Sequence, residues 1–213
     1  MTEIKAVVFD FGCVLAHEHL ESDLEEMADC LGLDLHVLRD AYWHHRHDYD
    51  AGISLGPLYF KQVAEKCGVA ITPQQVQQCV DIDNKSWSRP IHQVVDWAHR
   101  LRVHGIKIAI LSNMPQDFRD FLPNCTWLPE FHHATFSCEL KTVKPFHDIY
   151  HHCLNGLGVP PQNVLFIDDR LPNIEAAKEL GWQGFVFTNA DDLHEFLKET
   201  NLPPVLLAAT SNQ

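Results

Sequence analysis

The sequence predicts an α/β fold, a doubly wound parallel sheet with an inserted helical module. Short apolar runs without polar alternation indicate strands that are covered on both faces of a sheet. Between most of these runs the apolar residues recur with the period of a helix, and alternating strands and helices form a parallel sheet. One long segment, residues 16–89, contains helical patterns alone and is too long for a simple crossover.

The strands and helices of the predicted core follow one another along the chain. The apolar runs that predict strands are 6–9, 106–111, 134–136, 164–167 and 185–187, of which 134–136 is the weakest pattern. Helical periodicity predicts helices over 91–101, 146–157 and 174–180. Gly158 follows the second of these helices and is expected to end it, since glycine adopts the left-handed conformation of a helix C-terminus.

The segment 16–89 is predicted to form a helical cap above the sheet edge where Asp10 emerges. Its apolar residues indicate several helices, with Asp34 placed to cap the second and Thr72-Pro73 to begin the last. The predicted division is therefore a core of residues 1–15 and 90–213 with a cap of residues 16–89. The tail 203–213 is predicted to be a frayed end.

Composition excludes several classes of protein. The 213 residues carry a formal net charge of −13, which argues against nucleic-acid and anionic-membrane partners. No run approaches the ~20 apolar residues that cross a bilayer. Seven cysteines are scattered without a Cys-x-x-Cys spacing and no signal segment is present, which predicts reduced thiols and a cytoplasmic protein.

Polar residues follow the predicted strands at their carboxyl ends, where doubly wound sheets bind ligands. These residues are Asp10, Ser112, Asn113, Asp168 and Asp169, and Lys144 stands at the start of a predicted helix. Carboxylates gathered at one edge repel one another unless a hard cation lies between them, and ligation by oxygen alone suits Mg²⁺. A cation, a lysine and a helix N-terminus together attract an anion, most simply a phosphate.

Four motifs in order resemble those of the haloacid dehalogenase superfamily. They are VVFDFGCVL, ILSN, KPFHDIY and FIDDRLPNIEAA, and the resemblance covers essentially the whole chain. Many members of this superfamily carry a helical cap where this chain has residues 16–89. Most members are Mg²⁺-dependent phosphatases that act through an aspartyl-phosphate, so the resemblance implies a hydrolase of a small phosphorylated metabolite.

The resemblance also implies a role for each motif residue. Asp10 would be the nucleophile, and Mg²⁺ would be held by Asp10, the carbonyl of Gly12 and Asp169, with Asp168 in direct or water-mediated contact. Phosphoryl oxygens would be bound at Gly12, Ser112 and Asn113, and by Lys144, which would also offset the carboxylate charge. Asn173 would orient Asp168.

Gly12 departs from the usual superfamily pattern, which has a second aspartate two residues after the nucleophile. That aspartate performs general acid–base catalysis, typically worth about 10²–10⁴-fold in rate. The sequence resembles a capped subgroup with Asp-x-Gly, which includes sugar phosphatases such as α-D-glucose-1-phosphate phosphatase, and a cap histidine is one candidate for the missing acid. Two alternatives stay open: a weakly active or non-catalytic protein that binds a phosphorylated ligand or a protein partner, and a 2-haloacid dehalogenase.

The predicted cap offers one segment for substrate selection, Trp43–Ser54, which combines aromatic, cationic and histidine side chains. Arg46 and His47 are the candidates for contacts to the leaving group. The competing interpretation is a helix end that packs within the cap.

Overall fold

The computed structural model describes residues 3–203, and its centre is a sheet of parallel strands in the order β3-β2-β1-β4-β5. The strands are β1 (Ala6–Phe9), β2 (Lys107–Ser112), β3 (His133–Phe136), β4 (Val164–Asp168) and β5 (Gln183–Val186). The predicted doubly wound parallel sheet is therefore confirmed. The largest shift is at β5, which begins two residues earlier than its apolar run.

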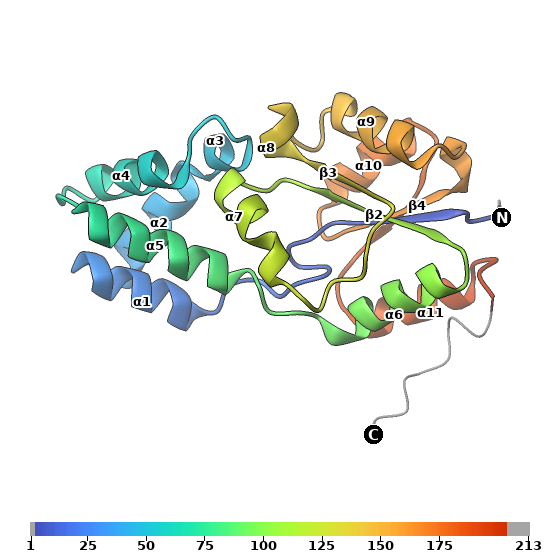
Figure 1. Ribbon diagram of the computed structural model, residues 1–213, viewed down its shortest axis with the longest axis horizontal. Helices are drawn as coiled ribbons and strands as arrows, with labels where there is room; N and C mark the ends of the chain where they lie inside the picture. Colours follow the sequence, from blue (N-terminus) through green and yellow to red (C-terminus); the bar gives the residue numbers. More distant parts are fainter. Residues whose placement is uncertain (1–2, 204–213) are drawn as a thin grey trace, which may run out of the picture.

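Strand β1 lies at the middle of the sheet and is buried on both faces. Its alternate residues belong to two different apolar clusters: Val7 and Phe9 to one, Ala6 and Val8 to the other. Helices α6 (His92–Val103) and α11 (Ala190–Lys198) cover the first face, and α9 (His147–Leu157) and α10 (Leu171–Glu179) cover the second. Figure 1 shows these pairs on opposite sides of the sheet. Burial on both faces explains why the strand sequences are apolar without alternation.

The register brings the ends of three strands together. Phe9 lies opposite Ile110 of β2 and opposite Ile167 of β4. The residue after Phe9 therefore emerges beside the ends of both neighbouring strands. From here the chain runs from β1 toward β2 and from β4 toward β5, on opposite sides, and open parallel sheets bind their ligands at such a point.

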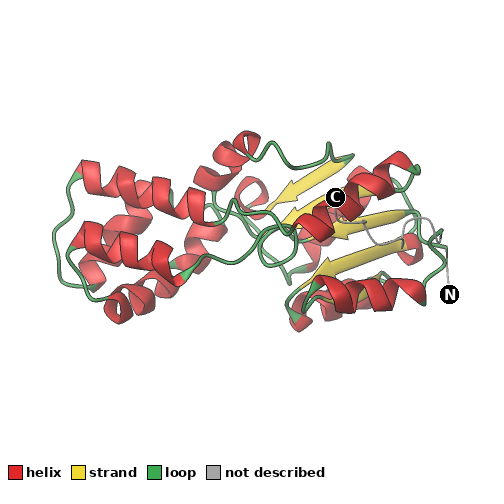
Figure 2. Ribbon diagram, turned by 90° about the horizontal axis from the view of Figure 1, so that it is seen from below, coloured by secondary structure: helices red, strands yellow, loops and turns green. Residues whose placement is uncertain are grey.

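Five helices between β1 and α6 form a unit that we call the helical module (residues 21–86). They are α1 (Glu21–Leu31), α2 (Leu35–His44), α3 (Arg46–Asp50), α4 (Gly56–Lys66) and α5 (Pro73–Ser86). The module has an apolar cluster of its own, which includes Leu24, Tyr59 and Cys79. In Figure 2 the strand arrows point toward the module, so it lies beyond the carboxyl edge of the sheet.

The helix ends test the capping predictions. Thr72 caps α5 as predicted, since its hydroxyl accepts a hydrogen bond from the backbone N–H of Gln75, and Pro73 is the first residue of that helix. Gly158 ends α9 in the left-handed conformation, with a φ of 62°. Asp34 occupies the N-cap position of α2, but its side chain makes no capping hydrogen bond, so that part of the prediction is wrong.

Short helices between the longer elements were not predicted, because one or two turns are too short to show a period. They are α7 (Gln116–Phe121), α8 (Ser137–Leu140) and the 3₁₀ turns Leu122–Asn124 and Pro161–Asn163. Helix α8 follows β3 directly and lies next to α3 of the helical module.

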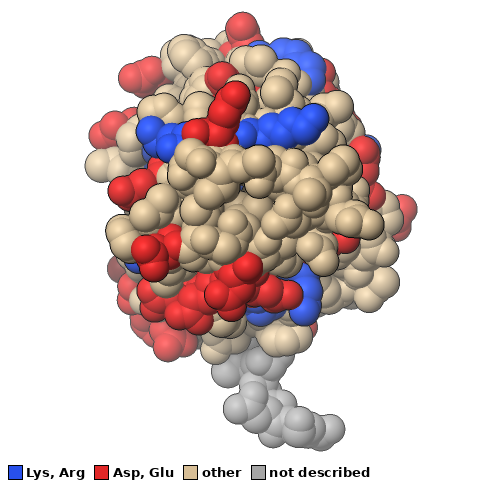
Figure 3. All heavy atoms as spheres, turned by 90° about the vertical axis from the view of Figure 1, so that its left-hand side faces the viewer, with Lys and Arg blue, Asp and Glu red and all other residues tan. Residues whose placement is uncertain are grey.

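The surface and the cysteines agree with the composition. Figure 3 shows acidic side chains grouped along the lower edge of the end formed by the helical module, and α1 carries several exposed acids, among them Glu21, Glu25 and Glu26. All seven cysteines are free thiols. No helix among the described residues is long and apolar enough to cross a membrane. The predicted frayed tail lies almost wholly outside the described residues.

Candidate active site

Asp10 follows the last residue of β1 and is 8% exposed at the carboxyl edge of the sheet. One oxygen, Oδ1, accepts a hydrogen bond from the N–H of Phe11 at 2.7 Å and lies 2.8 Å from Nζ of Lys144. The other oxygen, Oδ2, has no hydrogen-bond partner among the described residues. The carboxyl group is thus held by one oxygen and leaves the second available to a ligand.

Lys144 forms ion pairs with Asp10 of the first motif and with Asp168 of the last. Its Nζ lies 2.8 Å from Oδ1 of Asp10 and 2.7 Å from Oδ2 of Asp168, and the residue is 3% exposed. Burial lowers the pKa of Lys144, but the two carboxylates outweigh this effect and raise it above its usual value. The ammonium group therefore stays charged and offsets part of the negative charge at this edge.

Asp168 is fully buried and each of its oxygens is hydrogen-bonded. Asn173, one turn into α10, donates from its amide to both oxygens at 2.9 and 3.1 Å. The backbone N–H of Arg170 donates to Oδ1 at 2.8 Å, and Lys144 approaches Oδ2. The prediction that Asn173 orients Asp168 is confirmed.

The carboxylates of Asp10, Asp168 and Asp169 come together as the strand ends predicted. One oxygen of each lies within 4.8 Å of the others. Burial is the main cause that raises the pKa of Asp10 to about 7, and Asp168 and Asp169 add to this while Lys144 opposes it. The pKa of Asp169 is raised as well, by burial and by Asp168. Three carboxyl groups lie around one ammonium group at this edge, so the cluster suits a cation with oxygen ligands.

The end of β2 supplies Ser112 and Asn113. The hydroxyl of Ser112 has no partner among the described residues and lines the same cavity as Asp10. The amide of Asn113 instead holds the backbone of Lys144: its Oδ1 accepts from the Lys144 N–H at 2.8 Å, and its Nδ2 donates to the Lys144 carbonyl at 3.1 Å. Ser112 is thus free to bind an anion, whereas Asn113 positions the lysine; phosphate contact by Asn113 stays a prediction.

Gly12 lies against the indole of Trp87, the residue directly after α5. A Cβ atom at Gly12 would lie 3.1 Å from a ring carbon of Trp87. The aromatic ring therefore crowds the space that a side chain at position 12 would enter. Cys13 has a φ of 62°, and burial raises the pKa of its thiol to about 12, so it is not a reactive thiolate at neutral pH.

A cavity of about 440 Å³ connects these groups with the helical module, a volume within the range of small-molecule sites. The sheet edge contributes charged and hydroxyl groups, and the helical module contributes aromatic and charged ones. The lining of the cavity includes Asp10, Gly12, Ser112, Asn113, Lys144 and Asp169 from the sheet edge. From the segment between β1 and α6 it includes Glu18, Trp43, Arg46, Asp50 and Trp87.

The two candidates from the predicted cap differ in position. Arg46 lines the cavity, although its guanidinium is also paired with Asp50 and Asp83. His47 is not among the described residues that line the cavity, and its side chain is 72% exposed with Nδ1 3.4 Å from Asp48. The structure thus brings Arg46 to the site and leaves His47 at the surface. Asp50 and Trp87 line the cavity but were not predicted.

The family is established by comparison with known proteins. A family model described as haloacid dehalogenase-like hydrolase matches residues 4–181. That match covers most of the chain, and the motif residues lie at the strand ends described above. The chain therefore belongs to the haloacid dehalogenase-like hydrolases, as its motifs predicted, and it is a member of an enzyme family.

Several curated relatives are phosphatases. The chain is 26% identical to D-ribitol-5-phosphate phosphatase from Bacteroides thetaiotaomicron, over 91% of this chain and 97% of that protein. It is 23% identical to sesquiterpene phosphatase AstK from Aspergillus oryzae, over 89% and 92% respectively. A shorter match, 38% identical over 66 residues, covers 31% of this chain and 27% of flavin mononucleotide hydrolase 1 from Arabidopsis thaliana.

Solved structures share the fold. The magnesium complex of the family enzyme BT-2542 from Bacteroides thetaiotaomicron has a TM-score of 0.75 and 19% identity, covering 93% of this chain and 100% of that one. L-2-haloacid dehalogenase from Xanthobacter autotrophicus has a TM-score of 0.67 and 18% identity, covering 96% and 86%. At these identities the likeness shows the fold, and it does not separate phosphatase from dehalogenase.

Proposed function

We propose that this protein is a Mg²⁺-dependent phosphatase of a small phosphomonoester, and that the reaction passes through an aspartyl-phosphate on Asp10. One observation carries the proposal: the carboxylates of Asp10 and Asp169, a buried lysine and a free serine hydroxyl line one cavity at the end of β1, and the buried carboxylate of Asp168 lies within 4.8 Å of the other two. The phosphatases among the curated relatives support it. A sugar or polyol phosphate is a suitable substrate in size, and the free thiols suit the reducing cytoplasm.

The residues present fit a magnesium ion. Asp10, Asp169 and the backbone carbonyl of Gly12 would hold it, with Asp168 adjacent and already bonded to Lys144, Asn173 and Arg170. All of these donors are oxygens, which are the ligands that Mg²⁺ prefers. When bound, the ion would neutralise charge on the carboxylates and polarise the phosphoryl group.

The protein's own groups account for binding and attack. The hydroxyl of Ser112 and the ammonium of Lys144 would bind phosphoryl oxygens, because both line the cavity beside Asp10. Lys144 fixes Oδ1 of Asp10, so Oδ2 is the oxygen that would attack phosphorus. A buried carboxylate held in this orientation loses little freedom on reaching the reactive geometry.

The helical module would act as the cap, within the predicted division of 16–89 from 1–15 and 90–213. Trp43, Arg46 and Asp50 of the module, together with Trp87 directly after it, form the wall of the cavity opposite the strand ends. Groups in that position would contact the leaving group and exclude water while the phosphoryl group is transferred. The identity of the substrate would then depend on the module.

A phosphate-ester panel with Mg²⁺ tests this proposal. Wild type is expected to release phosphate, and Asp10→Asn is expected to lose more than about a thousandfold in kcat because the nucleophile is gone. Asp48→Asn, which changes an exposed acid of the helical module, is the matched control and should keep wild-type turnover. Tight Mg²⁺ binding without turnover would indicate the binding-only alternative, and halide release from 2-haloacids without metal would indicate a dehalogenase. Either result would contradict the proposal.

A further inference from the structure

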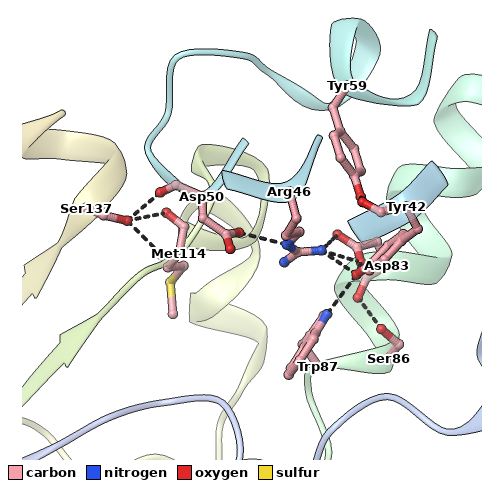
Figure 4. Close-up of polar contacts among 9 residues, drawn as sticks. All are labelled: Tyr42, Arg46, Asp50, Tyr59, Asp83, Ser86, Trp87, Met114 and Ser137. Atoms are coloured by element: carbon pink, nitrogen blue, oxygen red, sulfur yellow. Dashed lines mark hydrogen bonds and ion pairs between the residues drawn. The ribbon is translucent and has the colours of Figure 1, made fainter. Parts of the chain in front are cut away.

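Asp50, the last residue of α3, brings a carboxyl group from the helical module to the wall of the cavity. Figure 4 shows the guanidinium of Arg46 between the carboxyl groups of Asp50 and Asp83, with the indole of Trp87 below. Arg46 Nε donates to Oδ1 of Asp50 at 2.8 Å. Asp83, which pairs with the other side of the guanidinium, is 1% exposed and is not among the described residues that line the cavity.

The Asp50 carboxyl group has one oxygen to spare. Its Oδ2 has no hydrogen-bond partner in the part of the chain that the structure describes, and its side chain is 22% exposed. Burial raises the pKa of Asp50 to about 6, even though Arg46 acts in the opposite direction. A carboxyl group with a pKa near the working pH can give up a proton and take one back.

Hydrogen bonds tie Asp50 to the loop after β2. Ser137, the first residue of α8, donates its hydroxyl to the backbone carbonyl of Asp50 and accepts from the N–H of Met114 at 2.9 Å. Met114 stands two residues after Ser112, which is predicted to bind phosphate. Two hydrogen bonds through Ser137 therefore connect the backbone of Asp50 to this loop. Figure 4 shows Ser137 beside Asp50 and Met114, with dashed lines to both.

A second contact fixes the same turn. Lys141 donates from Nζ to the carbonyl of Gly52 at 2.5 Å. The backbone passes so close to α8 that a Cβ atom on Gly52 would lie 2.7 Å from the Cα of Cys138. The end of α3 is therefore docked against the core, which holds Asp50 in place at the cavity.

Other sources of a proton are less well placed. Gly12 has no side chain, and the space above it is crowded by Trp87. Among the described residues that line the cavity there is no histidine, so none of the six histidines of the predicted cap (residues 16–89) contributes to its wall. Glu18 lines the cavity as well, but its side chain is exposed to solvent.

We propose that Asp50 is the general acid and base of the reaction and supplies from the helical module the carboxyl group that Gly12 lacks. This inference rests on the phosphatase function proposed above. In the first half of the reaction, Oδ2 of Asp10 attacks phosphorus and the bond to the ester oxygen breaks. The departing ester oxygen takes the proton of the Asp50 carboxyl group and leaves as an alcohol.

The second half returns the proton. Asp50, now ionised, removes a proton from a water molecule, and the water oxygen attacks the phosphorus. The bond between phosphorus and Asp10 breaks, which releases inorganic phosphate and restores both carboxyl groups. Ester and water are consumed and alcohol and phosphate are formed, with no other reactant.

The test compares two substrates in Asp50→Asn, which keeps the size of the side chain. An alkyl phosphate needs a proton on its leaving oxygen, whereas p-nitrophenyl phosphate releases an anion that is stable at neutral pH. The variant is expected to lose about 10²–10⁴-fold in kcat/KM on the alkyl ester and less than about tenfold in kcat/KM on the aryl ester, because kcat/KM reports transfer to Asp10 and excludes the later hydrolysis that both substrates share. Equal loss on both, or no loss on either, would overturn the assignment.

Matched variants separate acid catalysis from support of Arg46. Asp83→Asn removes the other ion-pair partner of Arg46 and should leave the ratio of the two rates as in wild type. Glu18→Gln should also leave that ratio unchanged; a selective loss on the alkyl ester in this variant would assign the role to Glu18 instead. Asp50→Glu keeps a carboxyl group and is expected to recover part of the alkyl-ester activity.

Wild type alone provides a measurement if Asp50→Asn does not fold. Its kcat/KM on the alkyl ester should fall as pH rises above the pKa of the acid, while kcat/KM on p-nitrophenyl phosphate should not, because only the alkyl leaving group needs a protonated acid during transfer to Asp10. Parallel profiles would overturn the inference while leaving the phosphatase function intact. Absence of turnover on every ester would instead remove the phosphatase function, and the inference with it.

Discussion

The affinity of the site for Mg²⁺ should depend on pH between 6 and 8, because a proton on Asp10 competes with the metal. Burial raises the pKa of Asp10 to about 7 in the metal-free protein, with Asp168 and Asp169 adding to the shift and Lys144 opposing it. Since the ionised carboxylate is the form that binds a cation, affinity should fall as pH falls through this value. The raised pKa of Asp169 acts in the same direction.

The size of the effect follows from the pKa of Asp10. With a pKa of about 7, roughly one-tenth of the Asp10 side chains are ionised at pH 6 and roughly nine-tenths at pH 8. The Kd for Mg²⁺ should therefore be about tenfold higher at pH 6 than at pH 8 from this residue alone. At pH 7, binding should release about half a proton from Asp10.

Isothermal titration calorimetry measures both quantities. Titrations with MgCl₂ at each pH give the Kd, and repeating them in two buffers with different heats of ionisation gives the number of protons released. Asp10→Asn removes the titrating group and should bind Mg²⁺ more weakly with a flatter pH dependence. A Kd that is the same at pH 6 and pH 8, or proton uptake on binding, would refute the reasoning.

Three further substitutions test packing and hydrogen bonds by urea unfolding. Asn173→Ala removes two hydrogen bonds to the buried Asp168 and should lower the free energy of unfolding by about 2 kcal/mol; a change near zero would mean that water replaces them. Thr72→Ala removes the N-cap of α5 and should cost about 1 kcal/mol, and an unchanged transition would contradict the capping role. Gly12→Ala places a Cβ against Trp87 and should cost about 1–3 kcal/mol. The double variant with Gly12→Ala and Trp87→Leu should recover part of the lost free energy of unfolding. If the double variant instead loses the sum of the two single losses, the contact between residues 12 and 87 is contradicted.

The sheet and its polar edge could be predicted because local patterns encode them. Strands buried on both faces are continuous apolar runs, and Asp10, Ser112 and Asp168 come at the points where those runs end. Strand ends of a parallel sheet meet at one edge whatever the details of packing. The sequence alone therefore predicts that three of the motifs lie together.

The wall formed by the helical module could not be predicted in the same way. Asp50 reaches the cavity because the end of α3 docks on α8, and the hydrogen bond that fixes it joins residues 87 positions apart. Arg46 and His47 are neighbours, but successive residues of a helix point about 100° apart, so one faces the cavity and the other faces solvent. The sequence contains no local sign of which one turns inward.

The crowding of Gly12 by Trp87 is also a tertiary contact. The sequence shows that position 12 is glycine and that the usual aspartate is missing there. That an indole from the end of α5 crowds the vacated space depends on how α5 approaches the loop after β1. For the same reason the alternative proton donor could be sought among cap residues but not identified.

The central claim is that Asp10 receives the phosphoryl group, and trapping it is the most direct measurement. Wild-type protein would be quenched with acid during turnover of a phosphate ester with Mg²⁺ and then digested. The masses of its peptides would be measured by mass spectrometry. We expect the peptide that contains Asp10 to gain the mass of one phosphoryl group, and the same peptide from Asp10→Asn to gain nothing. Steady release of phosphate with an unmodified Asp10 peptide at every quench time would contradict the account.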